Sequence, residues 1–227
     1  MPFDGEWKLL KENEQCRVYS RDIPDGTGLP EFRGVGDIDG ISPWELGLVM
    51  RDYAFRRNWD NTTLQQGMLA NPEPDFWLSY NLSAPSLGGM ISARDFTDFQ
   101  FARADSDGGY THGGSACDFP EVPPLKGIVR GNNSSCGVRM QPIPGAPDKV
   151  RLHYVIRSDL RGSLPRWVVN KAMGGVIADF YAKLQLNLPK RDRSRYPPRP
   201  EAPGQASHPG FQIPRLDGTP GVVAPRG

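Results

Sequence analysis

Cysteine, net charge and long hydrophobic runs are all scarce in this sequence. Its 227 residues include three cysteines, Cys16, Cys117 and Cys136, at wide spacing and without a C-x-x-C pair. We therefore predict neither a disulfide framework nor a metal site. The formal net charge is +1, with 23% charged residues, so no overall electrostatic field favours nucleic acid as a partner.

The sequence also contains no signal for membrane insertion or secretion. No run of about 18 apolar residues occurs, and the first residues, Met-Pro-Phe-Asp-Gly-Glu-Trp, contain neither the basic nor the apolar region of a signal peptide. We therefore expect a soluble, cytoplasmic protein.

Composition divides the chain near residue 190. Residues 190–227 contain eight prolines and few aliphatic side chains, and they carry a net charge of +4, against −3 for residues 1–189. Such a segment buries too little apolar surface to offset its chain entropy. We predict one folded domain over residues 1–189 and a disordered, Pro-rich, basic tail over residues 190–227. The tail is either a solvated extension or an arm that binds anionic lipid, to which each Lys or Arg could add about 1 kcal/mol.

Strand periodicity dominates residues 1–189, with Gly, Pro and Asp turns between the segments. Nine segments are predicted as strands with short links, which implies an antiparallel sheet: Trp7–Leu10, Cys16–Asp22, Glu31–Ile38, Phe76–Ser83, Arg94–Arg103, Gly109–Asp118, Lys126–Gly131, Gly137–Ile143 and Val150–Ser158.

Two helices interrupt or follow the strands. Ser42-Pro43-Trp44-Glu45 is a capping box with Pro at the first helical position. The last helix is predicted to begin after Ser163 and to run to about Leu188, with an apolar stripe along one face. A long antiparallel sheet followed by an amphipathic helix indicates an α+β fold in which the sheet curls around the helix and encloses a cavity.

Three ordered blocks carry a family resemblance. They read Ile91-Ser-Ala-Arg-Asp-Phe96, Lys126-Gly-Ile-Val-Arg-Gly131 and Asp159-Leu-Arg-Gly-Ser-Leu-Pro-Arg-Trp-Val-Val-Asn170, with Cys136-Gly137 and Pro142-Ile-Pro-Gly145 between the last two. In order and spacing the chain resembles the START (StAR-related lipid transfer) family from about Trp7 to Leu188, most closely its small cytosolic sterol-binding members. The resemblance implies a helix-grip fold in which the C-terminal helix covers one hydrophobic lipid site.

This resemblance also implies a function in which no reaction is catalysed. We expect an intracellular lipid carrier that binds one sterol or sterol-like lipid, contacts membranes transiently, acts as a monomer and needs no cofactor. Two alternatives stay open at this point. One is a lipid sensor whose closed lid recruits a partner protein, and the other is a helix-grip enzyme that acts on a bound hydrophobic substrate.

The sequence departs from the family at two points. Family members usually carry a helix before the strand at Trp7, where six residues stand here, so we expect that helix to be absent or shortened. Cholesterol-binding members hold a buried Glu and Arg at the cavity floor, and the matching positions are Asn81 and Gln100. Two neutral amides keep hydrogen-bonding capacity but weaken the case for strict sterol specificity.

Strand alternation adds further candidates for lipid contact. Asp98 and Phe96 share a face with Gln100, and a carboxylate there needs a partner or a proton, so Asp98 could accept a ligand hydroxyl or pair with an Arg. Tyr154 lies on the apolar side of the last strand, whereas His153 lies on the polar side. The helix stripe contributes the remaining candidates, Met173, Ile177 and Phe180.

Two glycine-containing segments are candidates for movement at the entrance of the predicted cavity. In the family the loop over residues 84–91 edges the entrance, so Leu87, Met90 and Ile91 are candidates for membrane contact, or they plug the core. Gly174-Gly175 lies in the middle of the last helix and weakens it by about 1–2 kcal/mol relative to Ala. The pair either eases lid opening or permits close packing on the sheet.

Catalytic residues are hard to find. The only histidines are His112, His153 and His208, and none lies in a nucleophile motif. We therefore predict no catalytic site.

Overall fold

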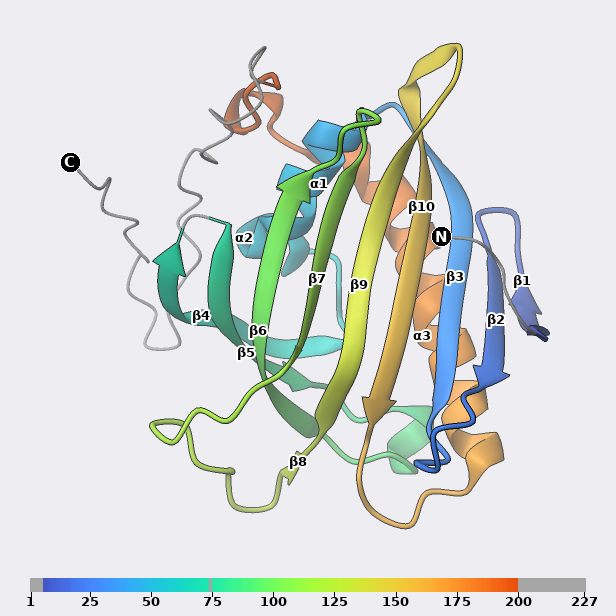
Figure 1. Cartoon of the computed structure of the whole chain (residues 1–227), viewed down its shortest axis with the longest axis vertical. Coiled ribbons are helices and arrows are strands. Elements are labelled where there is room, and N and C mark those ends of the chain that lie inside the picture. Colours follow the sequence, from blue (N-terminus) through green and yellow to red (C-terminus); the bar gives the residue numbers. More distant parts are fainter. Residues whose placement is uncertain (1–5, 74, 200–227) are drawn as a thin grey trace.

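The computed structural model describes residues 6–73 and 75–199, and Figure 1 shows their arrangement. In chain order the elements are β1 (Lys8–Glu12), β2 (Arg17–Asp22), β3 (Pro30–Asp39), α1 (Pro43–Arg51), α2 (Tyr53–Arg56), β4 (Thr63–Glu73), β5 (Phe76–Ser83), β6 (Arg94–Ala104), β7 (Tyr110–Ala116), β8 (Val129–Arg130), β9 (Asn132–Ile143), β10 (Ala146–Asp159) and α3 (Arg166–Asn187). Single 3-10 turns lie at Leu87–Gly89, Leu188–Lys190 and Arg193–Arg195.

One curved sheet holds all ten strands of the described residues. Its order is β1-β2-β3-β10-β9-β7-β6-β5-β4, with antiparallel neighbours throughout, and β8 pairs with β6 in parallel. The three helices lie together on one face of this sheet (Figure 1). This arrangement is the predicted α+β helix-grip fold, which is thereby confirmed.

Helix α3 approaches the sheet most closely over β3. A Cβ atom at Gly34 would lie 2.6 Å from Ile177 Cγ2 and 2.8 Å from Tyr181 Cε2, so only glycine lets the helix sit this deep. Tyr181 donates a 2.8 Å hydrogen bond to the carbonyl of Leu152 on β10. Although α3 has 22 residues, no helix in the described ranges combines the length and hydrophobicity of a transmembrane span.

The start of α1 follows the predicted cap. Ser42 Oγ accepts a 3.2 Å hydrogen bond from the Glu45 amide, and Pro43 occupies the first turn. Trp44 packs edge-on against Tyr110 of β7 with 5.7 Å between ring centroids. These contacts fix α1 over β7 and β9 and place α2, which follows directly, beside the cavity.

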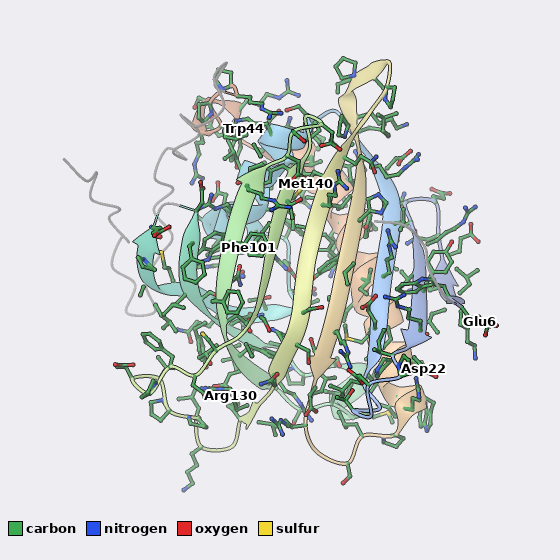
Figure 2. All side chains as sticks on the ribbon, viewed as in Figure 1. Glu6, Asp22, Trp44, Phe101, Arg130 and Met140 are labelled. Carbon is green, nitrogen blue, oxygen red and sulfur yellow. The ribbon has the colours of Figure 1, made fainter. Side chains whose placement is uncertain are left out.

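The strands differ from the sequence-based prediction at two places. β4 was not predicted, because Thr63–Glu73 lacks regular apolar alternation and contains Gly67 and Pro72. It forms the edge of the sheet, where a proline and the exposed Leu64 are tolerated. The segment Lys126–Gly131 contributes only the two-residue strand β8. Figure 2 shows Arg130 of β8 at the end of the sheet opposite Trp44.

The predicted boundary at residue 189 comes too early. Residues 190–199 dock on α1: Arg191 Nε binds Glu45 Oε1 at 2.7 Å, Tyr196 Oη donates to Asp52 Oδ2 at 2.9 Å, and Trp44 Nε1 donates to the Pro197 carbonyl at 2.9 Å. The expected disordered tail therefore does not begin at residue 190. Its remainder, residues 200–227 with His208, lies outside the described residues.

Candidate functional site

A cavity of about 420 Å³ lies between the sheet and the helices. This volume falls within the roughly 300–1,000 Å³ that is typical of small-molecule sites. Its wall combines apolar side chains, mostly of β6, β9, β10 and α3, with a comparable number of polar side chains, which come from α2, β4, β5, β6, β7, β9 and β10. The cavity can therefore hold an apolar ligand that also carries polar groups.

Most of the predicted lipid-contacting residues line this cavity. They are Asn81, Phe96, Asp98, Gln100, Tyr154, Met173 and Phe180. Ile177 differs, because it is fully buried and packs over Gly34, and Val176 beside it takes the lining position. The location of these side chains is established by the structure, and their contact with lipid stays a prediction.

The three predicted entrance residues have different environments. Met90 is 54% exposed, whereas Ile91 is 5% exposed, lines the cavity and packs with Val168 and Ala172 of α3. Leu87 packs at the edge of the same small cluster. The loop thus closes the cavity with Ile91, and Met90 is the member of the three that is available for contact with a membrane.

Gln100 is held by other protein side chains. Its Nε2 donates to Ser79 Oγ at 2.8 Å, and its Oε1 lies 2.7 Å from His112 Nε2 on β7. The His112 ring in turn lies against Trp77, with 5.2 Å between centroids. Both ends of the Gln100 amide are therefore occupied within the protein.

Asn81 and Gln100 do not form a joint site. In the β5–β6 register Asn81 lies opposite Phe96 and Gln100 lies opposite Trp77, which separates the two amides by four positions, about 13 Å along the strands. Asp98, opposite Ser79, lies between them on the same face. The acidic residue is thus the diagonal neighbour of Asn81 at the polar end of the cavity wall.

The environment of Asp98 is unusual for a carboxyl group. It is 6% exposed, and its Oδ2 accepts a 2.9 Å hydrogen bond from Asn133 Nδ2. Asn133 is held in turn by a hydrogen bond from Ser158 Oγ to its Oδ1. Asp98 Oδ1 is buried without a hydrogen-bond partner among the described residues, and so is Asn81 Oδ1. Burial raises the pKa of Asp98 to about 6, although the bond from Asn133 acts in the opposite direction.

The two arginines of the cavity wall are already engaged. Arg56 Nε binds Asp60 Oδ2 at 2.7 Å, and its guanidinium lies 5.4 Å from the centre of the Phe180 ring. Arg94 donates to the carbonyls of Ser92, at 2.5 Å, and Leu160, at 3.1 Å. Neither guanidinium is paired with Asp98 in these contacts.

Comparisons with known proteins agree with this geometry. The model of the START domain matches residues 4–188. The chain belongs to the START family. Among curated relatives, StAR-related lipid transfer protein 5 of Mus musculus is 29% identical over 186 residues, covering 81% of this chain and 86% of the relative. StAR-related lipid transfer protein 4 of Homo sapiens is 27% identical over 189 residues, covering 82% and 88%.

Solved structures of START proteins superimpose on the chain. Human StAR-related lipid transfer protein 5 has a TM-score of 0.71 at 26% identity, with 81% of this chain and 86% of that chain covered. A STAR-related lipid transfer protein fragment from Xanthomonas axonopodis has a TM-score of 0.64 at 25% identity, with 81% and 98% covered. The family resemblance inferred from the three sequence blocks is therefore confirmed.

The two charged residues Arg94 and Asp95 serve the fold separately. Their side chains lie on opposite faces of β6, so they do not pair with each other. Asp95 is fully buried and accepts from Arg130 Nε at 2.8 Å and from Tyr80 Oη at 3.2 Å, while Arg94 ties the 84–91 loop region to the segment before α3. This arrangement positions β8 and the 84–91 loop at the same end of β6.

Several polar residues of the START cavity were missed by sequence reasoning. They are Arg56, His112, Asn133, Cys136 and Ser158. Alternation along β7 would have placed His112 on the inner face, but a register shift between Arg157 and Ser158 obscures the pairing of Asn133. Burial raises the pKa of the Cys136 thiol to about 11, so this cavity cysteine stays protonated near neutral pH.

His153 lies outside the cavity, as its position on the polar side of β10 predicted. It is nevertheless 7% exposed rather than solvated, because Arg33 Nη2 lies 3.3 Å from its Nδ1 and Gln141 Oε1 lies 3.2 Å from its Nε2. Burial, together with the positive charge of Arg33, lowers the pKa of His153 to about 4. It therefore has no contact with a ligand in the START cavity.

Proposed function

We propose that this protein is a cytoplasmic lipid carrier, which binds one sterol or sterol-like lipid per chain in the cavity and exchanges it with membranes. The observation that carries the proposal is the 420 Å³ cavity beneath α3, whose wall combines apolar side chains with polar ones, Asp98 among them. Membership of the START family supports it, and so do the names of the relatives, which are lipid transfer proteins.

The energetics of such a site are compatible with transfer. Burying about 400 Å² of apolar lipid surface is worth about 10 kcal/mol relative to water. A bilayer supplies nearly the same apolar environment, so loading and release can be closely balanced. A polar contact worth about 1–3 kcal/mol is then enough to select the ligand.

Exposed apolar side chains at the entrance support contact with a membrane. Met90 of the 84–91 loop is 54% exposed, and Trp167 in the first turn of α3 is 60% exposed. The small cluster of Ile91, Val168 and Ala172 joins these two segments. The exposed residues therefore lie near the part of the cavity wall that contains Ile91. A membrane that binds both would meet the part of the wall through which a lipid would enter.

The proposal is tested by equilibrium titration of the purified protein with fluorescent sterol, fatty acid and phosphatidylcholine. Saturable binding of the sterol at one molecule per chain is expected, and the absence of saturable binding by all three would refute the proposal. Transfer between donor and acceptor vesicles then separates two roles. A carrier moves many lipid molecules per protein, whereas tight binding with slow release and no turnover would favour a lipid sensor.

A further inference from the structure

The segment beyond α3, residues 190–199, lies beside α1 (Figure 1). Arg191, whose side chain is 2% exposed, binds Glu45 at 2.7 Å, and Arg195 lies 3.0 Å from Asp52. This docked segment therefore depends on ion pairs with two acidic residues in and next to α1. A change of charge within it should shift the equilibrium between its docked and released forms.

Ser194 is the exposed residue at the centre of the 3-10 turn in the docked segment. Its hydroxyl donates to Asp192 Oδ1 at 2.7 Å, and its amide donates to the same oxygen at 3.1 Å. The bond from the hydroxyl is the main cause of the lowered pKa of Asp192, so this carboxylate is charged near neutral pH. Three arginines flank the serine in the sequence: Arg191, Arg193 and Arg195. An accessible hydroxyl thus lies between cationic side chains and beside an anionic one.

We propose that Ser194 is a phosphorylation site for an arginine-directed protein kinase, and that the modification releases residues 190–199 from α1. The serine oxygen attacks the γ-phosphorus of a nucleoside triphosphate, the bond from that phosphorus to its bridging oxygen breaks, and the nucleoside diphosphate leaves. The serine proton passes to a carboxylate of the kinase. A side chain that was neutral then carries a charge of about −1.5 to −2 at pH 7.

The phosphoryl group weakens docking in two ways. It replaces the proton that Asp192 accepts, so two anionic groups meet where the turn now has a hydrogen bond. Its oxygens also compete with Asp52 for the guanidinium of Arg195, because charge-assisted bonds from Arg to phosphate are strong. In a released chain the two anions can separate, and Arg195 is free to bind the phosphate. Phosphorylation therefore favours the released form.

Recognition by the kinase favours the released form as well. A kinase that reads arginine needs Arg191, three positions before Ser194, to be accessible. In the docked form this side chain is committed to Glu45. The kinase and α1 therefore compete for one guanidinium, and a variant that loosens docking should be phosphorylated faster.

Release also affects the cavity, through Asp52. This residue ends α1 and caps α2, where its Oδ1 accepts from the Phe55 amide at 3.0 Å. Tyr53 and Arg56 of α2 line the cavity. Loss of Arg195 from Asp52 should loosen this joint and speed the dissociation of a bound lipid, a consequence that rests on the proposed function.

Phosphorylation of the purified full chain by the catalytic subunit of cyclic-AMP-dependent protein kinase with Mg-ATP tests the site, and peptide mass spectrometry locates the phosphoryl group. Modification of Ser194 is expected, and it should be about tenfold faster in Glu45→Gln. Asp37→Asn, which alters an exposed pair with Arg151, is the matched control and should react at the native rate. No phosphate at Ser194 in any of these proteins, or equal rates in the native protein and Glu45→Gln, would overturn the inference.

The effect of the phosphoryl group is measured on protein that carries phosphoserine at position 194 from translation, so that no kinase is needed. Hydrogen exchange of the peptide 190–199 should become about tenfold faster or more. Ser194→Ala, which removes the hydroxyl without adding charge, should exchange like the native protein. Asp192→Asn should restore slow exchange in the phosphoserine protein, because a neutral amide does not repel the phosphate.

This inference and the proposed function can fail separately. Unchanged hydrogen exchange in the phosphoserine protein would overturn the release of residues 190–199, whatever the cavity binds. If fluorescent sterol does not bind saturably, the proposed function fails, whereas the exchange of the docked segment still decides this inference.

Discussion

His112 Nε2 and Gln100 Oε1 lie 2.7 Å apart, and this contact joins β7 to β6 across the inner face of the sheet. Because Gln100 Nε2 also donates to Ser79 Oγ on β5, one amide links side chains of three strands. Gln100 is therefore part of an internal hydrogen-bond network.

Gln100→Leu should accordingly affect stability more than ligand choice. The substitution leaves Ser79 and His112 without these partners, which should lower the free energy of unfolding by about 1–3 kcal/mol. Urea denaturation measures this loss, and the affinity for fluorescent sterol should stay close to that of the native protein. A large loss of sterol affinity with unchanged stability would instead place Gln100 in contact with the ligand.

Asp98 should make the protein less stable as the pH rises. Its pKa in the folded state, about 6, is above the ordinary value of 3.8, so the carboxyl group loses its proton less readily when folded. Its favourable contribution is complete below pH 4 and is lost as the pH rises through 6, by up to about 3 kcal/mol. The free energy of unfolding of Asp98→Asn minus that of the native protein should therefore increase between pH 4 and pH 7.

The same pH range contains an opposite effect from His153. Its folded-state pKa of about 4 is below the ordinary 6.5, so its contribution is present above pH 6.5 and is lost as the pH falls towards 4. Since His153 is present in both proteins, the difference between native and Asp98→Asn cancels it. A difference that does not change with pH would contradict the burial of an ionisable Asp98.

Replacing both Gly174 and Gly175 by Ala should stabilise α3 and slow lipid exchange. A Cβ atom at Gly174 would lie 3.7 Å from Leu10 Cβ, and one at Gly175 would meet nothing within 4 Å, so close packing does not require either glycine. The free energy of unfolding should rise by about 1–2 kcal/mol, and vesicle transfer should become slower. Gly34→Ala is the contrast, because its Cβ would collide with Ile177 and Tyr181 and should destabilise the protein. Faster transfer by the double Ala variant would show that helix flexibility does not limit exchange.

Arg130→Met should lower the free energy of unfolding strongly for a substitution at a partly exposed position. It leaves the fully buried Asp95 with only the Tyr80 hydroxyl as a side-chain partner, and removal of one member of a buried pair costs about 3–5 kcal/mol. Arg103→Met tests an exposed pair, Arg103 with Asp105, and should change stability by less than about 1 kcal/mol. Thermal and urea denaturation of the two variants should differ clearly, and equal losses would contradict the structural role of Asp95.

A chain truncated after residue 189 should be less stable than the full chain. A chain truncated after residue 199 keeps every contact described above and should retain the stability of the full chain. The shorter chain lacks Arg191, Tyr196 and the Pro197 carbonyl, which bind Glu45, Asp52 and Trp44 respectively. Loss of these three contacts should lower the free energy of unfolding by about 2–4 kcal/mol and alter the fluorescence of Trp44. Equal stability of the two truncated chains would show that the docking of residues 190–199 contributes little.

The sequence predicted those elements that are determined by residues only a few positions apart in the chain. The Ser42 cap, the Pro165 start of α3 and the face alternation of β5 and β6 can all be recognised within a few positions. β4 could not be recognised, because an edge strand needs little apolar alternation. The docking of residues 190–199 also escaped prediction, since it depends on Glu45 and Asp52, about 145 residues earlier in the chain.

The candidate site shows the same limit. Asn81, Asp98 and Gln100 could be assigned to one face by alternation, but the partners that decide their roles come from β7, β9 and β10. Which amide is saturated and which carboxyl oxygen is left without a donor depends on register across the sheet. That information is not contained in the pattern of any single strand.

Helix α3 is fastened unevenly along its length. Its C-terminal part is anchored by the Tyr181 hydroxyl bond, by the fully buried Leu184 and by Arg191 just beyond it. Its first turn has no side-chain cap and an exposed Trp167, and it is held by the ion pair of Arg166 with Asp22 and by Val168 in the small cluster with Ile91. At 1.5 Å per residue the 22-residue helix is about 33 Å long. A rigid rod of that length that tilts by about 10° around its anchored end moves its other end by about 6 Å. A small rotation about the anchored end would therefore open a gap beside Ile91.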